Sequence, residues 1–224
     1  MALDLAAGLS GWLQLQTVQR LGDSSGEDSA RLIATQIVNA QGRYAPAVSA
    51  LPNNWGSTKK RVDMALRGRS DSATGWYGAI EIKWPGTSFD PHLLRLDIVQ
   101  DAVRLGFIET GNDNARFLLL GGSTDAMSKL FDKPHPRAEQ RESRRIAFND
   151  LLSRDLKDPT GECSFSVWSR EFPGAGERVP DSVFASFNGK IKAELLAVEK
   201  ATTQGKARGT VYVWQCSRTR GRKT

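Results

Sequence analysis

The sequence predicts an α/β protein, in which helices and strands alternate along the chain. Three observations indicate this fold class. Residues 27–122 read in the order helix, strand, strand, strand, helix, strand. The expected strands are short apolar runs bounded by glycine, proline or loop residues. A length of 224 residues with 39% hydrophobic residues is enough for one substantial core.

Two segments of this region carry apolar residues at helical spacing. The first is "EDSARLIATQIVNAQG", residues 27–42, which follows the N-cap candidates at 23–25 and stops at Gly42. The second is "DPHLLRLDIVQDAVRLGFIE", residues 90–109, with Asp90 as N-cap and Pro91 at the first helical position. Both segments are therefore predicted to be helices.

The strands are expected between and after these helices. A short strand is expected around 47–51, and longer ones in "KKRVDMALRG", "GWYGAIEIKWPG" (75–86) and "ARFLLLGG" (115–122). The second and third strands are joined by a loop and are expected to be adjacent and antiparallel. Because side chains alternate along a strand, Ile80 and Ile82 share one face of 75–86, whereas Glu81 and Lys83 share the other.

The region after residue 122 is predicted to continue the same domain. It is expected to contain a helix over 125–131, a charged helix over 138–156, a strand over 163–172, a helix over 181–201 and a strand over 209–218. The predicted organisation is an N-terminal helix that packs on the core (1–26), a core (27–122), an α+β extension of that domain (123–217) and a basic tail (218–224).

The charge is uneven and points to a polyanionic partner. The net charge is +6, and residues 113–224 hold 20 Lys and Arg against 14 Asp and Glu, whereas residues 1–112 hold 11 of each. Clustered basic residues release counterions from phosphate backbones, so DNA is the expected partner. The tail is expected to contribute nucleic-acid contacts through Arg218, Arg220, Arg222 and Lys223.

Composition also argues against several other classes of protein. Cys163 and Cys216 form no CxxC pair and the chain has only two histidines, so a zinc or iron–sulfur site is not expected. Any metal would be held mainly by oxygen. The N-terminal segment has no basic start, contains Asp4 and lacks an apolar run long enough to cross a bilayer. A cytoplasmic protein with no membrane partner is expected.

Charged residues on the two central strands indicate a hydrolytic site. Pairing of these strands brings Asp63 close to Glu81 and Lys83. Two converging carboxylates suit Mg²⁺, which takes one or two carboxylates together with water and substrate phosphate. A neighbouring ammonium can orient the attacking water or stabilise charge in the transition state. This is the chemistry of phosphodiester hydrolysis.

Asp63, followed after a loop by Glu81-Ile82-Lys83, resembles the PD-(D/E)XK nuclease superfamily. The resemblance covers about 27–122 and implies a restriction-endonuclease-like core, a central mixed sheet flanked by helices. It implies Asp63 and Glu81 as ligands of Mg²⁺, for which Mn²⁺ substitutes, and Lys83 as the catalytic lysine. Glu27 is the candidate for a further acidic residue on the first helix, with Asp28 as its rival.

The resemblance also suggests a biological setting, and two departures from the motif qualify it. An endonuclease of bacterial restriction, defence or DNA repair is expected, with a homodimer and a protein partner in a defence complex as further expectations. Val62 stands where the motif has proline, and Arg104 follows Gln100 by four residues, so the glutamine–tyrosine signature of the exonuclease branch is incomplete.

Three alternatives stay open. A non-catalytic module of the same fold would bind nucleic acid or protein without cleaving it. A nuclease toxin domain would carry the same chemistry in a different setting. The plainest alternative for Glu81 and Lys83 is a solvated strand face with cross-strand ion pairs, each worth about 0–1 kcal/mol.

Overall fold

The computed structural model of the chain describes residues 1–19, 26–50, 61–68, 76–86, 88–110, 115–132, 139–180, 184 and 187–219, with side chains omitted at 139–141. The helices are α1 (Ala2–Val18), α2 (Glu27–Ala40), α3 (Pro91–Phe107), α4 (Thr124–Phe131), α5 (Glu139–Leu151) and α6 (Phe165–Glu171). The strands are β1 (Tyr44–Ala50), β2 (Val62–Gly68), β3 (Trp76–Lys83), β4 (Ala115–Ser123), β5 (Thr160–Ser164), β6 (Lys190–Thr203) and β7 (Lys206–Thr219). The chain is thus an α/β protein, as predicted.

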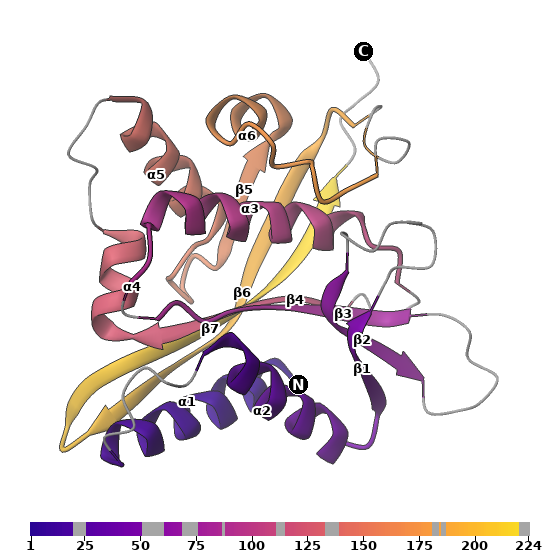
Figure 1. Cartoon of the computed structure of the whole chain (residues 1–224). Coiled ribbons are helices and arrows are strands. Elements are labelled where there is room, and N and C mark those ends of the chain that lie inside the picture. Colours follow the sequence, from indigo (N-terminus) through magenta and orange to yellow (C-terminus); the bar gives the residue numbers. More distant parts are fainter. Residues whose placement is uncertain are drawn as a thin grey trace.

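The strands form one mixed sheet of seven strands in the order β1-β2-β3-β4-β7-β6-β5. The neighbouring strands are antiparallel except for β3 and β4, which are parallel and joined through α3. Helices α1 and α2 cover one face of the sheet, and α3, α4, α5 and α6 lie on the other (Figure 1). Within the described ranges, no helix is both long and apolar enough to cross a bilayer.

The predicted element order from 27 to 122 is confirmed as α2-β1-β2-β3-α3-β4. The N-terminal helix, α4 and the strand that becomes β7 are confirmed as well. Strand β1 starts at Tyr44, three residues before the predicted start, and α5 ends at Leu151, five residues before the predicted end. The predicted strand over 115–122 is β4, which pairs with strands on both sides.

The prediction of a strand over 163–172 is wrong for most of its length. Strand β5 ends at Ser164, and the chain continues as the short helix α6. Phe165, Trp168 and Phe172 lie three and four residues apart, which is helical spacing. Trp168 and Phe172 are buried, and Trp168 packs edge-on against Phe165 with ring centroids 4.9 Å apart. Burial of these aromatic side chains on one side of a helix explains why the segment forms α6 and not a strand.

The prediction of a helix over 181–201 is also wrong. Lys190–Thr203 is strand β6, which pairs with β5 on one side and β7 on the other. Every second side chain from Ile191 to Ala197 is buried, which is the period of a strand. Lys, Glu, Ala and Leu favour helices, but hydrogen bonding to two neighbouring strands outweighs that preference. Residues 181–183 and 185–186 of the predicted helix lie outside the described residues.

Strand β3 is buried on both faces, and this arrangement positions the candidate site. Ile80 and Ile82 pack in the core under α1 and α2, as the alternation predicts. Ala79 packs in the opposite core, which α3 covers. Glu81 lies on the same side as Ala79, so its carboxylate is directed into the covered face.

Close approach of β3 and β4 explains the glycine at position 78. A Cβ atom there would lie 2.1 Å from the carbonyl oxygen of Ala115, its partner on β4. We therefore expect Gly78→Ala to lower the free energy of unfolding by about 1–3 kcal/mol, because the strands must move apart. Gly11→Ala is the control in urea titrations, since its Cβ meets no atom within 4 Å on helix α1. Gly11→Ala should raise the free energy of unfolding by up to about 1 kcal/mol. Equal effects of Gly78→Ala and Gly11→Ala would contradict the prediction.

The two cysteines are buried thiols of the core. Burial raises the pKa of Cys163 to about 11 and that of Cys216 to about 12. A raised pKa leaves about a thousandth or less of each thiol as thiolate at pH 8, and thiolate is the reactive form. We expect iodoacetamide at pH 8 to leave the folded protein unmodified and to alkylate both cysteines in guanidinium chloride. Rapid alkylation of the folded chain, measured by mass spectrometry, would contradict this.

Candidate active site

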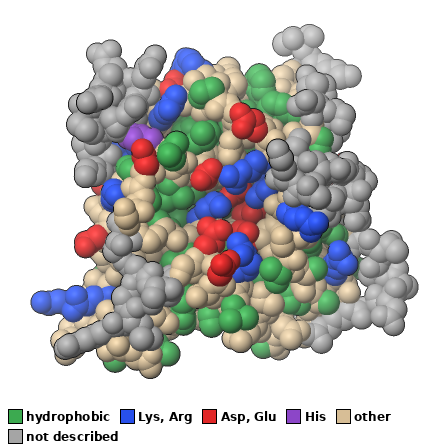
Figure 2. Space-filling model, in the orientation of Figure 1, with side chains coloured by type: hydrophobic (Ala, Val, Ile, Leu, Met, Phe, Trp, Pro, Cys, Tyr) green, Lys and Arg blue, Asp and Glu red, His purple; other side chains and the backbone are tan. Residues whose placement is uncertain are grey.

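Asp63 and Glu81 lie next to each other on β2 and β3. The antiparallel register pairs Met64 with Ile80. The next residue on each strand is Asp63 on β2 and Glu81 on β3, so these two lie opposite each other. Asp63 Oδ2 accepts a hydrogen bond of 2.8 Å from the backbone amide of Ile82, which fixes the carboxylate against β3. Figure 2 shows acidic and basic side chains gathered near the middle of one face of the molecule.

Glu27 and Lys83 meet at the same place. Lys83 Nζ lies 3.7 Å from Glu27 Oε2, and the lysine side chain is 14% exposed. Glu27 is in the first turn of α2, directed toward β3, whereas the side chain of its rival Asp28 is 94% exposed and contacts Arg31. The structure thus brings the four predicted residues Glu27, Asp63, Glu81 and Lys83 into one cluster.

Arg31, which sequence reasoning missed, joins α2 to β2. It follows Glu27 by four residues and therefore lies on the same side of the helix. Its Nη2 atom is 2.9 Å from Asp63 Oδ1 and 3.2 Å from Glu27 Oε1. One guanidinium nitrogen is thus shared by carboxylates from two different elements.

Helix α3 supplies two further charged residues from the opposite side. Asp101 and Arg104 are three residues apart and both are buried. Arg104 Nη2 lies 2.6 Å from Glu81 Oε1 and 2.7 Å from Asp101 Oδ1, and Arg104 Nη1 donates to the carbonyl of Arg61. Asp101 Oδ2 in turn lies 3.1 Å from Lys83 Nζ. Arg178, which follows α6, also contacts Asp101 and pairs with Asp97 at 2.8 Å.

These contacts form a continuous series of alternating acids and bases. The series, which we call the charge cluster, runs Asp63, Arg31, Glu27, Lys83, Asp101, Arg104, Glu81. Its two ends are adjacent on β2 and β3. Glu81 is only 1% exposed, so the solvated strand face is wrong as an account of this residue.

Glu81 and Asp101 are both buried, but their pKa values shift in opposite directions. Desolvation raises the pKa of Glu81 well above its usual value, and the negative charge of Asp101 raises it further. Desolvation also acts on Asp101, but Arg104, Lys83 and Arg178 outweigh it and lower the pKa of Asp101. Desolvation disfavours the charged form of Lys83, yet Asp101, Glu27 and Asp63 outweigh it and raise the pKa of Lys83. Asp101 and Lys83 are therefore the stable ion pair of the cluster.

The donor set offers carboxylate oxygens, which suit a hard divalent cation. Among the described residues, no group of three or more Asp, Glu, His or Cys side chains is arranged to hold a metal ion. However, Arg31 Nη2 lies between the carboxylates of Asp63 and Glu27, a position that a metal cation could take. Buried Glu81 Oε1 has an ion pair but no hydrogen bond in the described part of the chain. Two carboxylates, water and substrate phosphate are a typical Mg²⁺ environment, so Asp63 and Glu81 fit the implied metal.

The chain was compared with protein-family models, curated proteins and solved structures, and no match was found. The candidate site therefore stands on the sequence motif and the geometry of the charge cluster.

The predicted nucleic-acid contacts lie mostly outside the described residues. This is the case for Arg220, Arg222 and Lys223. Arg218, on β7, places its guanidinium over the ring of Phe107, 4.7 Å from the ring centroid. This contact ties Arg218 to the C-terminal end of α3.

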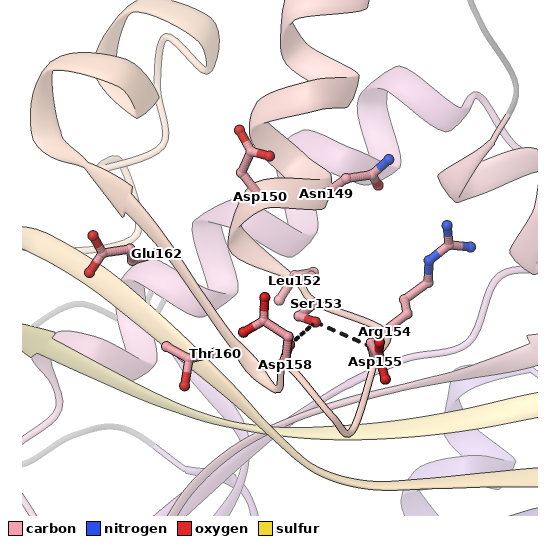
Figure 3. A pocket seen from close by; sticks show the side chains of 9 residues that line it. All are labelled: Asn149, Asp150, Leu152, Ser153, Arg154, Asp155, Asp158, Thr160 and Glu162. Carbon is pink, nitrogen blue, oxygen red and sulfur yellow. Dashed lines mark hydrogen bonds between the residues drawn. The ribbon is translucent and has the colours of Figure 1, made fainter.

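A separate pocket lies between α5 and β5 and shares no residue with the charge cluster (Figure 3). Its volume is about 620 Å³, and its lining includes Asp150, Asp155, Asp158 and Glu162. Ser153 Oγ donates to the carbonyl of Asp158 at 2.6 Å and accepts from the amide of Asp155, which closes the turn at its base. An acidic lining repels phosphate, so nucleic acid is not expected here.

Proposed function

We propose that the chain is a metal-dependent DNA endonuclease with a restriction-endonuclease-like core. The observation that carries the proposal is the convergence of Asp63, Glu81 and Lys83 from two adjacent strands, with Glu27 from the preceding helix. The order α2-β1-β2-β3-α3-β4, which the resemblance implied, supports it further. The net charge of +6 is in keeping with a polyanionic substrate.

Each residue has a defined task in this proposal. Asp63 and Glu81 would hold Mg²⁺, which when bound supplies Lewis-acid stabilisation of the phosphoryl oxygens. Lys83 keeps its positive charge beside the reacting phosphate and stabilises the charge that develops there. Glu27, 3.7 Å from Lys83, orients the ammonium. Asp101 holds the same ammonium from the other side at 3.1 Å.

The proposed setting is a bacterial restriction, defence or repair pathway. DNA is the substrate, and a second copy of the chain and a protein partner of a defence complex are proposed as further partners. A homodimer would place two sites on the two strands of a duplex.

Cleavage of defined substrates tests the proposal. The purified chain and its Asp63→Asn variant are incubated with supercoiled plasmid, linear duplex and single-stranded DNA in Mg²⁺, Mn²⁺ or EDTA. We expect the plasmid to be nicked or linearised with either metal, not in EDTA and not by the variant. A folded wild-type protein that cuts none of these substrates would contradict the proposal.

One observation favours a non-catalytic nucleic-acid-binding module instead. Each carboxylate of the charge cluster already pairs with a cation of the protein, as expected of an internal structural network. Such a module would bind DNA with an affinity that falls steeply with salt and would leave DNA intact with Mg²⁺ and Mn²⁺.

A further inference from the structure

We infer that Arg31 is a built-in competitor of the catalytic cation, which it excludes from Asp63 until it moves to a phosphate of the nucleic acid. This inference concerns the regulation of the proposed site and rests on the proposed function. It starts from the position of Arg31 Nη2, within 3.2 Å of carboxylate oxygens from both α2 and β2.

In the described part of the chain, Arg31 pairs with Asp63 and Arg104 with Glu81, and Arg31 is the more exposed of these two arginines. The side chain of Arg104 is 6% exposed and bound between Glu81 and Asp101, both fully buried. The side chain of Arg31 is 22% exposed, so it has more access to solvent than that of Arg104.

Asp28 is a third carboxylate partner of Arg31 and lies outside the charge cluster. Arg31 Nη1 lies 2.6 Å from Asp28 Oδ1, and the Asp28 side chain is 94% exposed. The guanidinium can therefore release Asp63 and remain paired at the surface. Asp63 Oδ2 stays fixed to β3 by the amide of Ile82, so the carboxylate keeps its position when the arginine leaves.

The competition links metal binding to substrate binding. A guanidinium binds phosphate, as it binds carboxylate, through two parallel charge-assisted hydrogen bonds. DNA phosphate at the site draws Arg31 away from Asp63 and frees the oxygen that a cation needs. Metal and DNA then bind with positive cooperativity, since each binds better when Arg31 has moved.

The test measures Mn²⁺ affinity without DNA and DNA affinity without metal. The full chain, Arg31→Met and the control Arg170→Met are titrated with Mn²⁺ and followed by the electron paramagnetic resonance of free Mn²⁺. Met keeps the aliphatic stem of the arginine. Arg170 also pairs with a carboxylate but is 73% exposed on α6. Circular dichroism and thermal unfolding establish that each variant is folded.

We expect Arg31→Met to bind Mn²⁺ about tenfold more tightly than the wild type, since the cation then no longer competes with a charge-assisted hydrogen bond to Asp63. In EDTA the same variant should bind duplex DNA more weakly, with the slope of log K against log salt reduced by about one. Arg170→Met should change neither affinity.

The outcomes separate this inference from the proposed function. Equal or weaker Mn²⁺ binding by Arg31→Met, with clear binding by the wild type, overturns the competitor role and leaves the nuclease proposal intact. If neither protein binds Mn²⁺ at millimolar concentration, the proposed metal site fails and the inference fails with it.

Discussion

We expect Lys83→Met to lower the rate of metal-dependent DNA cleavage by about 10²- to 10³-fold, which is the typical effect of removing one preorganised group that stabilises charge in the transition state. Lys83 follows Glu81 by two residues on the same face of β3, so its ammonium lies beside the proposed metal ligand. Asp101 and Glu27 keep it charged and in place. Methionine removes the charge while it preserves most of the side-chain volume.

Single-turnover cleavage of a plasmid measures this effect, with Lys200→Met as the control. Lys200 is exposed on β6 and pairs with Thr210 across the ladder to β7. The control should cleave at the wild-type rate, and both variants should show the circular dichroism spectrum of the wild type. Cleavage by Lys83→Met within threefold of the wild-type rate would exclude Lys83 from the reaction.

Asp101→Asn lowers the free energy of unfolding by about 3 kcal/mol or more. The Asp101 side chain is fully buried and contacts Lys83, Arg104 and Arg178. Asparagine keeps the shape but removes the negative charge, and the three cations then lack their shared partner. Loss of one partner of a buried ion pair typically costs about 3–5 kcal/mol.

Urea titration followed by tryptophan fluorescence checks this expectation, and Asp97→Asn is the matched control. Asp97 also pairs with Arg178, but its side chain is 46% exposed, so its removal should cost less than about 1 kcal/mol. Urea unfolding curves with the same midpoint and slope for Asp101→Asn and the wild type would contradict the prediction. They would mean that water solvates the three cations once the carboxylate is lost.

The sequence predicted the fold where local signals and tertiary packing agree. Asp90 and Pro91 define the start of α3, and the Asp90 side chain accepts a hydrogen bond from the amide of His92. Prediction failed at β6, where helix-favouring residues are held in a strand by two neighbours that are remote in sequence. In the sequence, the signal for a strand was the alternation of Ile191, Ala193 and Leu195 with charged residues, and the helix-favouring composition obscured it.

The candidate site could be predicted only in part, for a related reason. Asp63, Glu81 and Lys83 follow from the period of two adjacent strands, so sequence reasoning could bring them together. Asp101 and Arg104 lie in a stretch of α3 that is buried all round, so periodicity does not show which side meets the sheet. Gln100, which the sequence singled out, donates to the carbonyl of Gly174 and lies outside the charge cluster.

The pairing of β4 with β7 also has a consequence for how the protein is made. Residues of β4 find their partners on β7 about a hundred residues later, as with Phe117 and Gln215. A nascent chain on the ribosome therefore exposes an unsatisfied apolar strand edge until β7 has been synthesised. Such edges invite aggregation, so chaperones that shield nascent chains should increase the yield of soluble protein. The central sheet is completed only when β7 has left the ribosome and paired with β4.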